Sequence, residues 1–481
     1  MRKSSTFVFD LSRRKPLAAC VAAIFAVPAA YANSVFVTNC NDSGVGSLRD
    51  AVASAMDSDT VDMKGLTSAS SGCSASKITL TTGDVVVNQN NLTIDGPGMT
   101  NLTITAKYSN GSIRHQYQNR IFTHNGTGLL SVQNVSLSKG YVVSATGSAR
   151  GGCIYSHLGN VSLYKTGVYF CGAHTTSGIA IGGAVYARGN LSLKYSVISY
   201  NSADGGSGGA AVGGGLVNGG QFSAKYSTIS ANTAAGSSGH VTGTGGGVYT
   251  AGGGHTVIRG TTISGNASGN AVGGIVLLGS TGTTATITNS TISGNTATAV
   301  PTGVVGGMYT DTPVLNIYNS TIAFNAASTG SAGFSPGVAL SAGSLGSTVR
   351  LSSTLIANNT YGSSATNNDL GVLGSVTISG QNNLIRVSSA SLPSGTIAGQ
   401  CPILGTLRFN GGRTQTHALF SHSPGIDQGN NTLTLAQDQR GGPFDSSPYP
   451  YPRVSNGIAD IGAFELQQAE IIFDANFEGC P

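Results

Sequence analysis

Carboxylates, the groups on which glycosidic-bond cleavage and calcium binding depend, are almost missing from the centre of this sequence. Between residues 96 and 368 the only acidic residues are Asp204 and Asp311, and the first glutamate of the chain is Glu465. Hydrolysis of a glycosidic bond generally needs two carboxyl groups flanking that bond. Calcium needs several oxygen ligands, usually including carboxylates. The central part of the chain therefore lacks the groups for this chemistry.

Acidic residues return near the C-terminus together with arginine. We interpret this cluster as buried ion pairs and turn-capping carboxylates. A calcium site is the alternative interpretation, and we expect no other cofactor. A Ser-His-Asp triad also stays open, because the chain is rich in serine. The members of the cluster are Asp427, Asp438, Arg440, Asp460 and Glu465.

Tyrosine recurs at matching places in the central part of the chain, twice with lysine. Exposed tyrosine beside lysine suits a glycan or an envelope surface, because the ring offers an apolar face and a polar tip. The alternative is that the tyrosines stack between repeats or lie in the core. The first set is Lys194, Tyr195, Lys225 and Tyr226, and a second set after paired glycines is Tyr155, Tyr186, Tyr249 and Tyr309.

The N-terminus predicts export. Five basic residues precede the apolar run 17–27, and Ala30-Tyr31-Ala32 offers a small-x-small cleavage site. Residues 1–32 therefore read as a secretory signal peptide, and we expect a secreted or envelope-associated bacterial protein. The run is too short to predict a transmembrane anchor.

Charge argues against nucleic acid as a partner. Without residues 1–32 the chain carries 19 basic and 18 acidic residues, a net charge of +1. The net charge is −4 over residues 33–95, +9 over 96–368 and −4 over 401–481. A mildly basic centre between acidic ends could attract an anionic polymer through its long-range field. The plainer interpretation is solvated lysine and arginine on a long surface.

Six cysteines remain after cleavage, and an even number in an exported chain indicates disulfides. Sequence proximity favours three pairs, although other connectivities stay open. The pairs are Cys40–Cys73, Cys153–Cys171 and Cys401–Cys480.

The centre of the chain repeats about every 30 residues. Each period holds three short alternating runs separated by Gly, Ser and Asn, which predicts three strands per coil. Stacked coils of this kind form an all-β, right-handed parallel β-helix, expected over residues 85–400. A propeller is the competing repeat fold, but its blades usually need longer repeats. We expect the closing asparagines to stack in a hydrogen-bonded ladder: Asn201, Asn232, Asn266, Asn295, Asn325 and Asn358.

Both ends of the repeat region look like caps, which cover the open strand edges of a solenoid. Residues 33–84 form the expected N-terminal cap, with a helix-compatible stretch from Ser47 to Met56. Residues 401–465 lose the repeat and form the expected closing cap, followed by a tail over 466–481.

Several motifs make the chain similar to a known family. Val37-Thr38-Asn39, Gly46-Ser47-Leu48-Arg49 and Leu92 to Gly98 resemble the N-terminal signatures of bacterial secreted β-helix proteins. Thr416-His417-Ala418-Leu419, Asp438-Gln439-Arg440-Gly441 and Asp460 to Glu465 resemble the choice-of-anchor Q domain. The resemblance implies an exported protein of the polymorphic-outer-membrane-protein-like kind, without an established activity. The tail resembles a short C-terminal sorting segment; the alternative is a last edge strand held by Cys480.

These observations favour a non-catalytic protein that binds an extracellular or envelope polysaccharide or a surface protein, as in adhesion. A polysaccharide lyase or glycoside hydrolase, with its site in the variable loops or the acidic C-terminal cluster, is the first alternative. A purely structural surface protein is the second.

Overall fold

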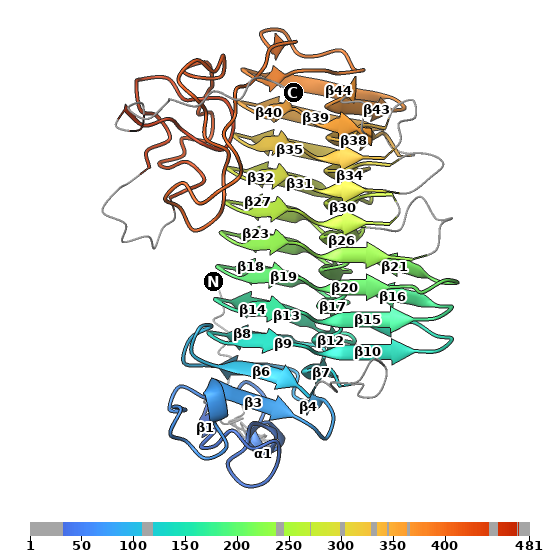
Figure 1. Cartoon of the computed structure of the whole chain (residues 1–481), viewed down its shortest axis with the longest axis vertical. Coiled ribbons are helices and arrows are strands. Elements are labelled where there is room, and N and C mark those ends of the chain that lie inside the picture. Colours follow the sequence, from blue (N-terminus) through green and yellow to red (C-terminus); the bar gives the residue numbers. More distant parts are fainter. Residues whose placement is uncertain are drawn as a thin grey trace, which may run out of the picture. The chain divides into compact units, whose positions relative to one another are not determined.

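Short strands separated by tight turns make up nearly all of the regular structure (Figure 1). The computed structural model describes residues 32–107, 119–236, 245–269, 271–298, 304–328, 334–343, 346–362, 366–441, 451–468 and 470. Within these ranges the strands stack coil upon coil in parallel register. Only β41 and β42 pair in antiparallel fashion among the described strands. The predicted all-β parallel β-helix is confirmed.

Three long sheets form the walls of the β-helix. Sheet A consists of β1 (Ser34–Phe36), β2 (Thr60–Asp62), β5 (Leu92–Asp95), β8 (Leu129–Gln133), β13 (Asn160–Tyr164), β18 (Leu191–Lys194), β23 (Phe222–Lys225), β27 (Thr256–Arg259), β31 (Thr284–Thr288), β35 (Val314–Tyr318), β39 (Ser347–Ser352) and β44 (Val376–Gln381). Sheet B consists of β3 (Lys77–Leu80), β6 (Thr103–Ala106), β9 (Ser136–Ser138), β14 (Gly167–Tyr169), β19 (Val197–Ser199), β24 (Thr228–Ser230), β28 (Thr262–Ser264), β32 (Thr291–Ser293), β36 (Thr321–Ala323), β40 (Leu355–Ala357), β45 (Leu384–Ile385) and β46 (Ile397–Ala398). Sheet C consists of β4 (Val85–Val87), β7 (Phe122–His124), β12 (Ile154–Ser156), β17 (Val185–Ala187), β22 (Leu216–Asn218), β26 (Val248–Ala251), β30 (Ile275–Leu278), β34 (Met308–Thr310), β38 (Val338–Ser341) and β43 (Leu370–Leu373).

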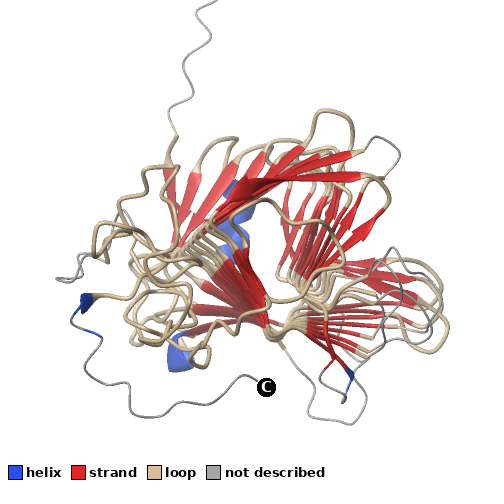
Figure 2. Ribbon diagram, turned by 90° about the horizontal axis from the view of Figure 1, so that it is seen from above, coloured by secondary structure: helices blue, strands red, loops and turns tan. Residues whose placement is uncertain are grey.

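Two further sheets lie beside these walls when the β-helix is seen from above (Figure 2). The buried side chains of their thin core are alanines, at positions 149, 173, 180, 203, 211 and 234, with the partly buried Val142 packed against them. Sheet D consists of β10 (Tyr141–Ser144), β15 (Gly172–Thr175), β20 (Ser202–Asp204), β25 (Thr233–Ala235), β29 (Ala267–Ser268), β33 (Thr296–Ala297), β37 (Ala326–Ala327), β41 (Thr360–Tyr361) and β42 (Thr366–Asn367). Sheet E consists of β11 (Ala149–Arg150), β16 (Ile179–Ile181) and β21 (Ala210–Val212).

The repeated Thr-Ile-Ser runs of the sequence become strands of sheet B whose central residue points into the core. The parallel register places Ile198, Ile229, Ile263 and Ile292 directly above one another. All four are at most 1 % exposed. Because neighbouring strands lie about 4.8 Å apart, identical side chains stack closely and exclude water along the axis. The Thr and Ser on either side point outward.

The N-terminal region contains the helix that the sequence predicts. Helix α1 spans Leu48–Ser54, and Ser47 caps it by accepting a hydrogen bond from Asp50 N at 3.2 Å. Its apolar face (Leu48, Ala51 and Val52) is buried. The sheets begin earlier than the predicted boundary at residue 85, since β1, β2 and β3 already pair in sheets A and B. A short 3-10 helix spans Ser74–Ser76.

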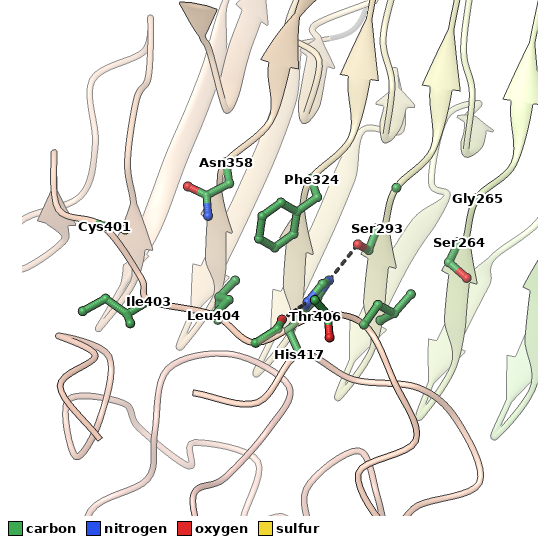
Figure 3. A pocket seen from close by; sticks show the side chains of 13 residues that line it. Ser264, Gly265, Ser293, Phe324, Asn358, Cys401, Ile403, Leu404, Thr406 and His417 are labelled. Carbon is green, nitrogen blue, oxygen red and sulfur yellow. Dashed lines mark hydrogen bonds between the residues drawn. The ribbon is translucent and has the colours of Figure 1, made fainter. Parts of the chain in front are cut away.

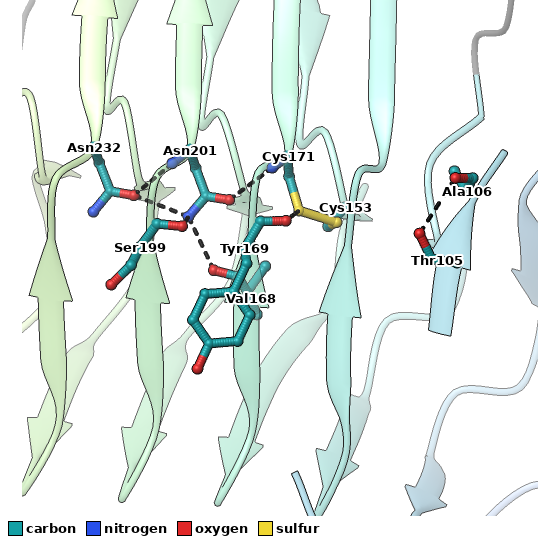
Figure 4. Close-up of a disulfide and its surroundings, with 9 residues drawn as sticks. All are labelled: Thr105, Ala106, Cys153, Val168, Tyr169, Cys171, Ser199, Asn201 and Asn232. Carbon is teal, nitrogen blue, oxygen red and sulfur yellow. Dashed lines mark hydrogen bonds between the residues drawn. A yellow bond between two sulfur atoms is a disulfide. The ribbon is translucent and has the colours of Figure 1, made fainter. Parts of the chain in front are cut away.

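The predicted asparagine ladder lies inside the coil, and each amide donates to the next (Figure 4). Its Nδ2 to Oδ1 distances are 2.8–2.9 Å through Asn201, Asn232, Asn266, Asn295, Asn325 and Asn359. The prediction is wrong for Asn358, because that residue has φ +58° and its Oδ1 accepts from Arg386 Nη1 instead. Asn359 takes the ladder position and donates to Asp369 Oδ1 at 2.8 Å.

Disulfides fasten two early coils. Cys40–Cys73 and Cys153–Cys171 are both formed, as predicted. Cys171 occupies the ladder position of its coil, where its backbone N–H donates to Asn201 Oδ1 at 2.9 Å (Figure 4). Cys401 is disulfide-bonded, and its predicted partner Cys480 lies outside the described residues, with most of the predicted tail.

The region predicted as a closing cap lies along the flank of the β-helix. Residues 401–441 and 451–468, here called the C-terminal segment, follow the outer face of sheet B across several coils (Figure 1). Thr262, Thr291 and Thr321, in three successive coils, all bond to it. The outward hydroxyls of sheet B supply partners for its irregular backbone along the flank. In the described parts of the chain, no helix is long and apolar enough to cross a membrane.

Candidate glycan-binding face

Two rows of residues in the left-handed backbone conformation border sheet B, one at each end of its strands. Their φ values lie between +43° and +64°, and each turns the chain sharply where one strand ends. Row 1, before each strand, contains Asn134, Lys165, Tyr195, Tyr226, Gly260, Asn289, Asn319, Ser353 and Asn382. Row 2, after each strand, contains Lys139, Phe170, Tyr200, Ala231, Gly265, Gly294, Phe324 and Asn358.

The C-terminal segment docks on row 1 in the later coils. The side-chain amides of Asn289, Asn319 and Asn382 donate to backbone carbonyls of the segment at 2.8–3.1 Å. Between the rows, the outer face of sheet B is apolar where Leu355 and Leu384 pack against the segment, which contributes Leu419, Ile461 and Phe464. This half of sheet B is therefore an internal interface and is not available to a ligand.

A pocket of about 500 Å³ remains between row 2 and the C-terminal segment (Figure 3). Row 2 carries glycine at 265 and 294, where other coils place Phe170, Tyr200 or Phe324. Because these two glycines have no side chain, the space that a ring would fill in another coil is part of the pocket. Its lining is mostly apolar, with the polar groups of Ser264, Ser293, Asn358, Thr406 and His417 among the lining residues.

Ser293 and His417 meet in this pocket, with Oγ and Nε2 2.7 Å apart (Figure 3). His417 Nδ1 lies 2.7 Å from the carbonyl oxygen of Gly405, which can only accept, so Nδ1 carries the proton and Nε2 accepts from the serine hydroxyl. Burial lowers the pKa of His417 to about 4, which keeps the ring neutral at pH 7. In a Ser-His-Asp triad a carboxylate orients the histidine; here a backbone carbonyl holds that place.

In the earlier coils the C-terminal segment reaches the row 1 border of sheet B, where the Arg413 guanidinium lies over the Tyr195 ring. The hydrogen bonds described above begin at Thr262 of β28. Over β14, β19 and β24 the outward residues are Gly167, Tyr169, Val197, Ser199, Thr228 and Ser230; we call them, with their flanking aromatic residues, the sheet B face. Ser199 and Ser230 share a hydrogen bond between their Oγ atoms at 2.7 Å. The surface is thus rich in hydroxyls and low in charge.

On the row 2 border of this face, Phe170 and Tyr200 stack with ring centroids 5.4 Å apart and an interplanar angle of 14°. They are 58 % and 60 % exposed. Neither ring is among the residues predicted from the sequence. The available signal was an aromatic residue directly before the ladder position in Phe170-Cys171 and Tyr200-Asn201.

On the row 1 border lie the lysines and tyrosines that the sequence singled out. The register pairs Lys194 with Lys225, and Tyr195 stacks on Tyr226 at 5.4 Å. Tyr195 is only 8 % exposed, since Lys194 Nζ and the guanidinium of Arg413 both lie 5.6 Å from its ring centroid. The structure brings the four residues together. The Tyr195 side chain is packed against its neighbours, whereas Lys225 is exposed.

The acidic C-terminal cluster is a buried ion network. Asp438 and Arg440 pair at 2.8 Å with both side chains fully buried. Glu465 accepts hydrogen bonds from the backbone N–H groups of Ser455 and Asp460 and lies 4.0 Å from Arg453. Arg453 is a buried member of the cluster that was not predicted from the sequence. Burial and the charge of Asp460 raise the pKa of Glu465 to about 8. Asp460 accepts a hydrogen bond from the backbone N–H of Asp427.

The two central acids have local partners in different parts of the coils. Asp204 in sheet D lies 3.2 Å from His174 Nδ1, and Asp311 accepts a hydrogen bond from Gly279 N at 2.8 Å. Within the described ranges, no group of three or more His, Cys, Asp or Glu is arranged to hold a metal ion. No family model, curated protein or solved structure matches the chain.

Proposed function

We propose that the protein is an exported, non-catalytic glycan-binding protein of the bacterial cell surface or surroundings. In this proposal residues 1–32 are removed, and the chain belongs with the choice-of-anchor Q, polymorphic-outer-membrane-protein-like proteins that its motifs resemble. Two disulfides support an oxidising compartment. The ligand would be an extracellular or envelope polysaccharide, and its binding would serve adhesion.

The single observation that carries the proposal is the Phe170–Tyr200 stack. Two large rings more than half exposed are an apolar platform in a chain whose surface is otherwise rich in small polar residues. Sugar rings present apolar C–H faces that such platforms accept, while a tyrosine tip adds a hydrogen-bonding group.

The rest of the sheet B face suits the same ligand. The hydroxyls of Thr228 and Ser230 lie half-buried between the two aromatic borders and can donate and accept hydrogen bonds, while Ser199 is buried beside them and bonds to Ser230. The borders are five residues apart in sequence, from Tyr195 to Tyr200, or roughly 16 Å for an extended chain. A polysaccharide running along the coils would meet the two rings of the platform in consecutive coils, with centroids 5.4 Å apart.

The experiment is affinity electrophoresis of the chain without residues 1–32 in gels that contain neutral or acidic polysaccharides, with and without calcium. The same mixtures are assayed for new reducing ends and new unsaturated ends. Retardation by a polysaccharide without product is the expected result. Product formation would overturn the non-catalytic assignment. The absence of retardation in every gel would overturn glycan binding and favour a structural role.

A further inference from the structure

A second aromatic surface lies on the outer face of sheet C, away from sheet B. The register places Tyr155 and Tyr186 at equivalent outward positions of β12 and β17. Their rings stack with centroids 5.6 Å apart and an interplanar angle of 28°. Both tyrosines are half-buried, while their strand neighbours Ile154 and Val185 point inward and are fully buried.

Each of these tyrosines carries an arginine over its ring. The Arg120 guanidinium lies 5.1 Å from the Tyr155 centroid, and that of Arg150 lies 5.8 Å from the Tyr186 centroid. Such cation–π contacts hold the planar guanidinium while leaving its N–H groups available to a ligand. Two coils thus present the same pair of groups.

Two more cationic or polar side chains extend the surface. Arg188 follows Tyr186 by two residues, and His157 follows Tyr155 by two, so they share a register position, and both are exposed. The Tyr155 hydroxyl lies 2.8 Å from His157 Nδ1. We call this set the arginine–tyrosine patch: Arg120, Arg150, Tyr155, His157, Tyr186 and Arg188.

The patch has more positive charge than the described residues around it neutralise. Arg120 pairs with Asp84 at 3.4 Å and donates from Nε to the carbonyl of Arg150 at 3.1 Å. Arg150 and Arg188 make no ion pair with a described residue. Arg150 Nε is buried and has no hydrogen-bond partner among the described residues.

We propose that the arginine–tyrosine patch binds the acidic sugar units of a carboxylated or sulfated polysaccharide. Arg150 and Arg188 hold the acid groups, and the tyrosine rings hold the guanidinium groups of Arg120 and Arg150 in place. This site goes beyond the sheet B face, where the described side chains between the rows are uncharged. Its place in the central, basic stretch of the chain adds a field that attracts a polyanion.

The test compares Arg188→Gln and Arg150→Gln with Arg350→Gln, which removes one exposed arginine from β39 of sheet A. Binding to polygalacturonate and to heparin is measured by affinity electrophoresis at low and at high salt. Arg188 is exposed, so its replacement leaves the fold intact. We expect each patch variant to weaken binding of at least one acidic polymer about tenfold at low salt, and the control to change it less than twofold.

The outcomes separate this site from the sheet B face. An equal loss in Arg350→Gln would show attraction by net charge alone and would overturn the patch, as would unchanged binding in both patch variants. Competition by millimolar inorganic sulfate as effective as by polymer would reduce the site to a simple anion site. Neutral polysaccharides should bind the patch variants as they bind the parent, because that binding is assigned to the sheet B face and not to the patch.

Discussion

Phe170 and Tyr200, in consecutive coils, stack at 5.4 Å with both rings more than half exposed. The same row continues with Gly265 and Gly294, where the absence of a side chain opens the pocket beside the C-terminal segment. The row 2 position thus forms an aromatic platform in the earlier coils and part of a pocket in the later coils. The sequence at this position decides which of the two forms.

The asparagine ladder should carry a large share of the stability. In Asn266→Ala, the neighbouring amides of Asn232 and Asn295 each lose a buried partner. We expect a loss of about 3 kcal/mol in the free energy of unfolding. Asn358→Ala, in the adjacent row, should cost less, about 1.5 kcal/mol, because it removes one acceptor, that of the bond from Arg386 Nη1. Urea unfolding followed by circular dichroism measures both, and equal losses would contradict the ladder assignment.

The cysteine at the ladder position can be replaced by the residue of the later coils. Cys153→Ala/Cys171→Asn removes the disulfide but restores an amide that can donate to Asn201 Oδ1. It should be about 1 kcal/mol more stable than Cys153→Ala/Cys171→Ala. Unfolding midpoints under identical conditions give the comparison. A less stable asparagine variant would show that the ladder cannot extend into this coil.

Glu465 should make the protein less stable as the pH rises. Its pKa is raised to about 8 in the folded protein, from an ordinary value of 4.5, so the folded state holds a proton that the unfolded state has lost. Stability therefore falls between these values, by up to about 1.4 kcal/mol per pH unit. Melting temperatures from pH 6.5 to 8 should decline more steeply in the parent than in Glu465→Gln. Parallel profiles would mean that Glu465 does not titrate in this range.

His417 should act in the opposite direction at lower pH. The folded ring has a pKa of about 4 against 6.5 for an ordinary histidine, so the unfolded state binds the extra proton. Stability is lost as the pH falls from 6.5 to 4, and the contact with Ser293 weakens with it. The difference in melting temperature between the parent and His417→Gln should shrink or reverse over this range. A constant difference would contradict the buried, neutral ring.

The repeat alone was enough to predict the coils, because alternating runs and closing asparagines recur at nearly constant spacing. It placed the last ladder residue one position early, since Asn358 and Asn359 are adjacent and only the backbone conformation distinguishes them. The position of the C-terminal segment could not be predicted. The outward Thr262 and Thr291, which it covers, look in sequence like Thr228, which lies beyond those contacts.

The candidate site was predicted only along one border. Lys194-Tyr195 and Lys225-Tyr226 stood out because the pair recurs at equivalent positions. The exposure of Phe170 and Tyr200 depends on the left-handed turn that precedes the ladder position, and no residue type marks that turn. Each arginine over Tyr155 or Tyr186 comes from the preceding coil, a few positions before the equivalent place, so the contact depends on the exact register of the coils.

The most direct test of glycan binding is the dissociation constant of Phe170→Ala/Tyr200→Ala for the polysaccharide that retards the parent most. Phe36→Ala serves as the matched control, since Phe36 is 65 % exposed on β1. Removal of the platform should weaken binding at least about tenfold, with the melting temperature nearly unchanged because both rings are exposed. Phe36→Ala should bind as the parent does. Undiminished binding by the double variant would contradict the assignment of the sheet B face.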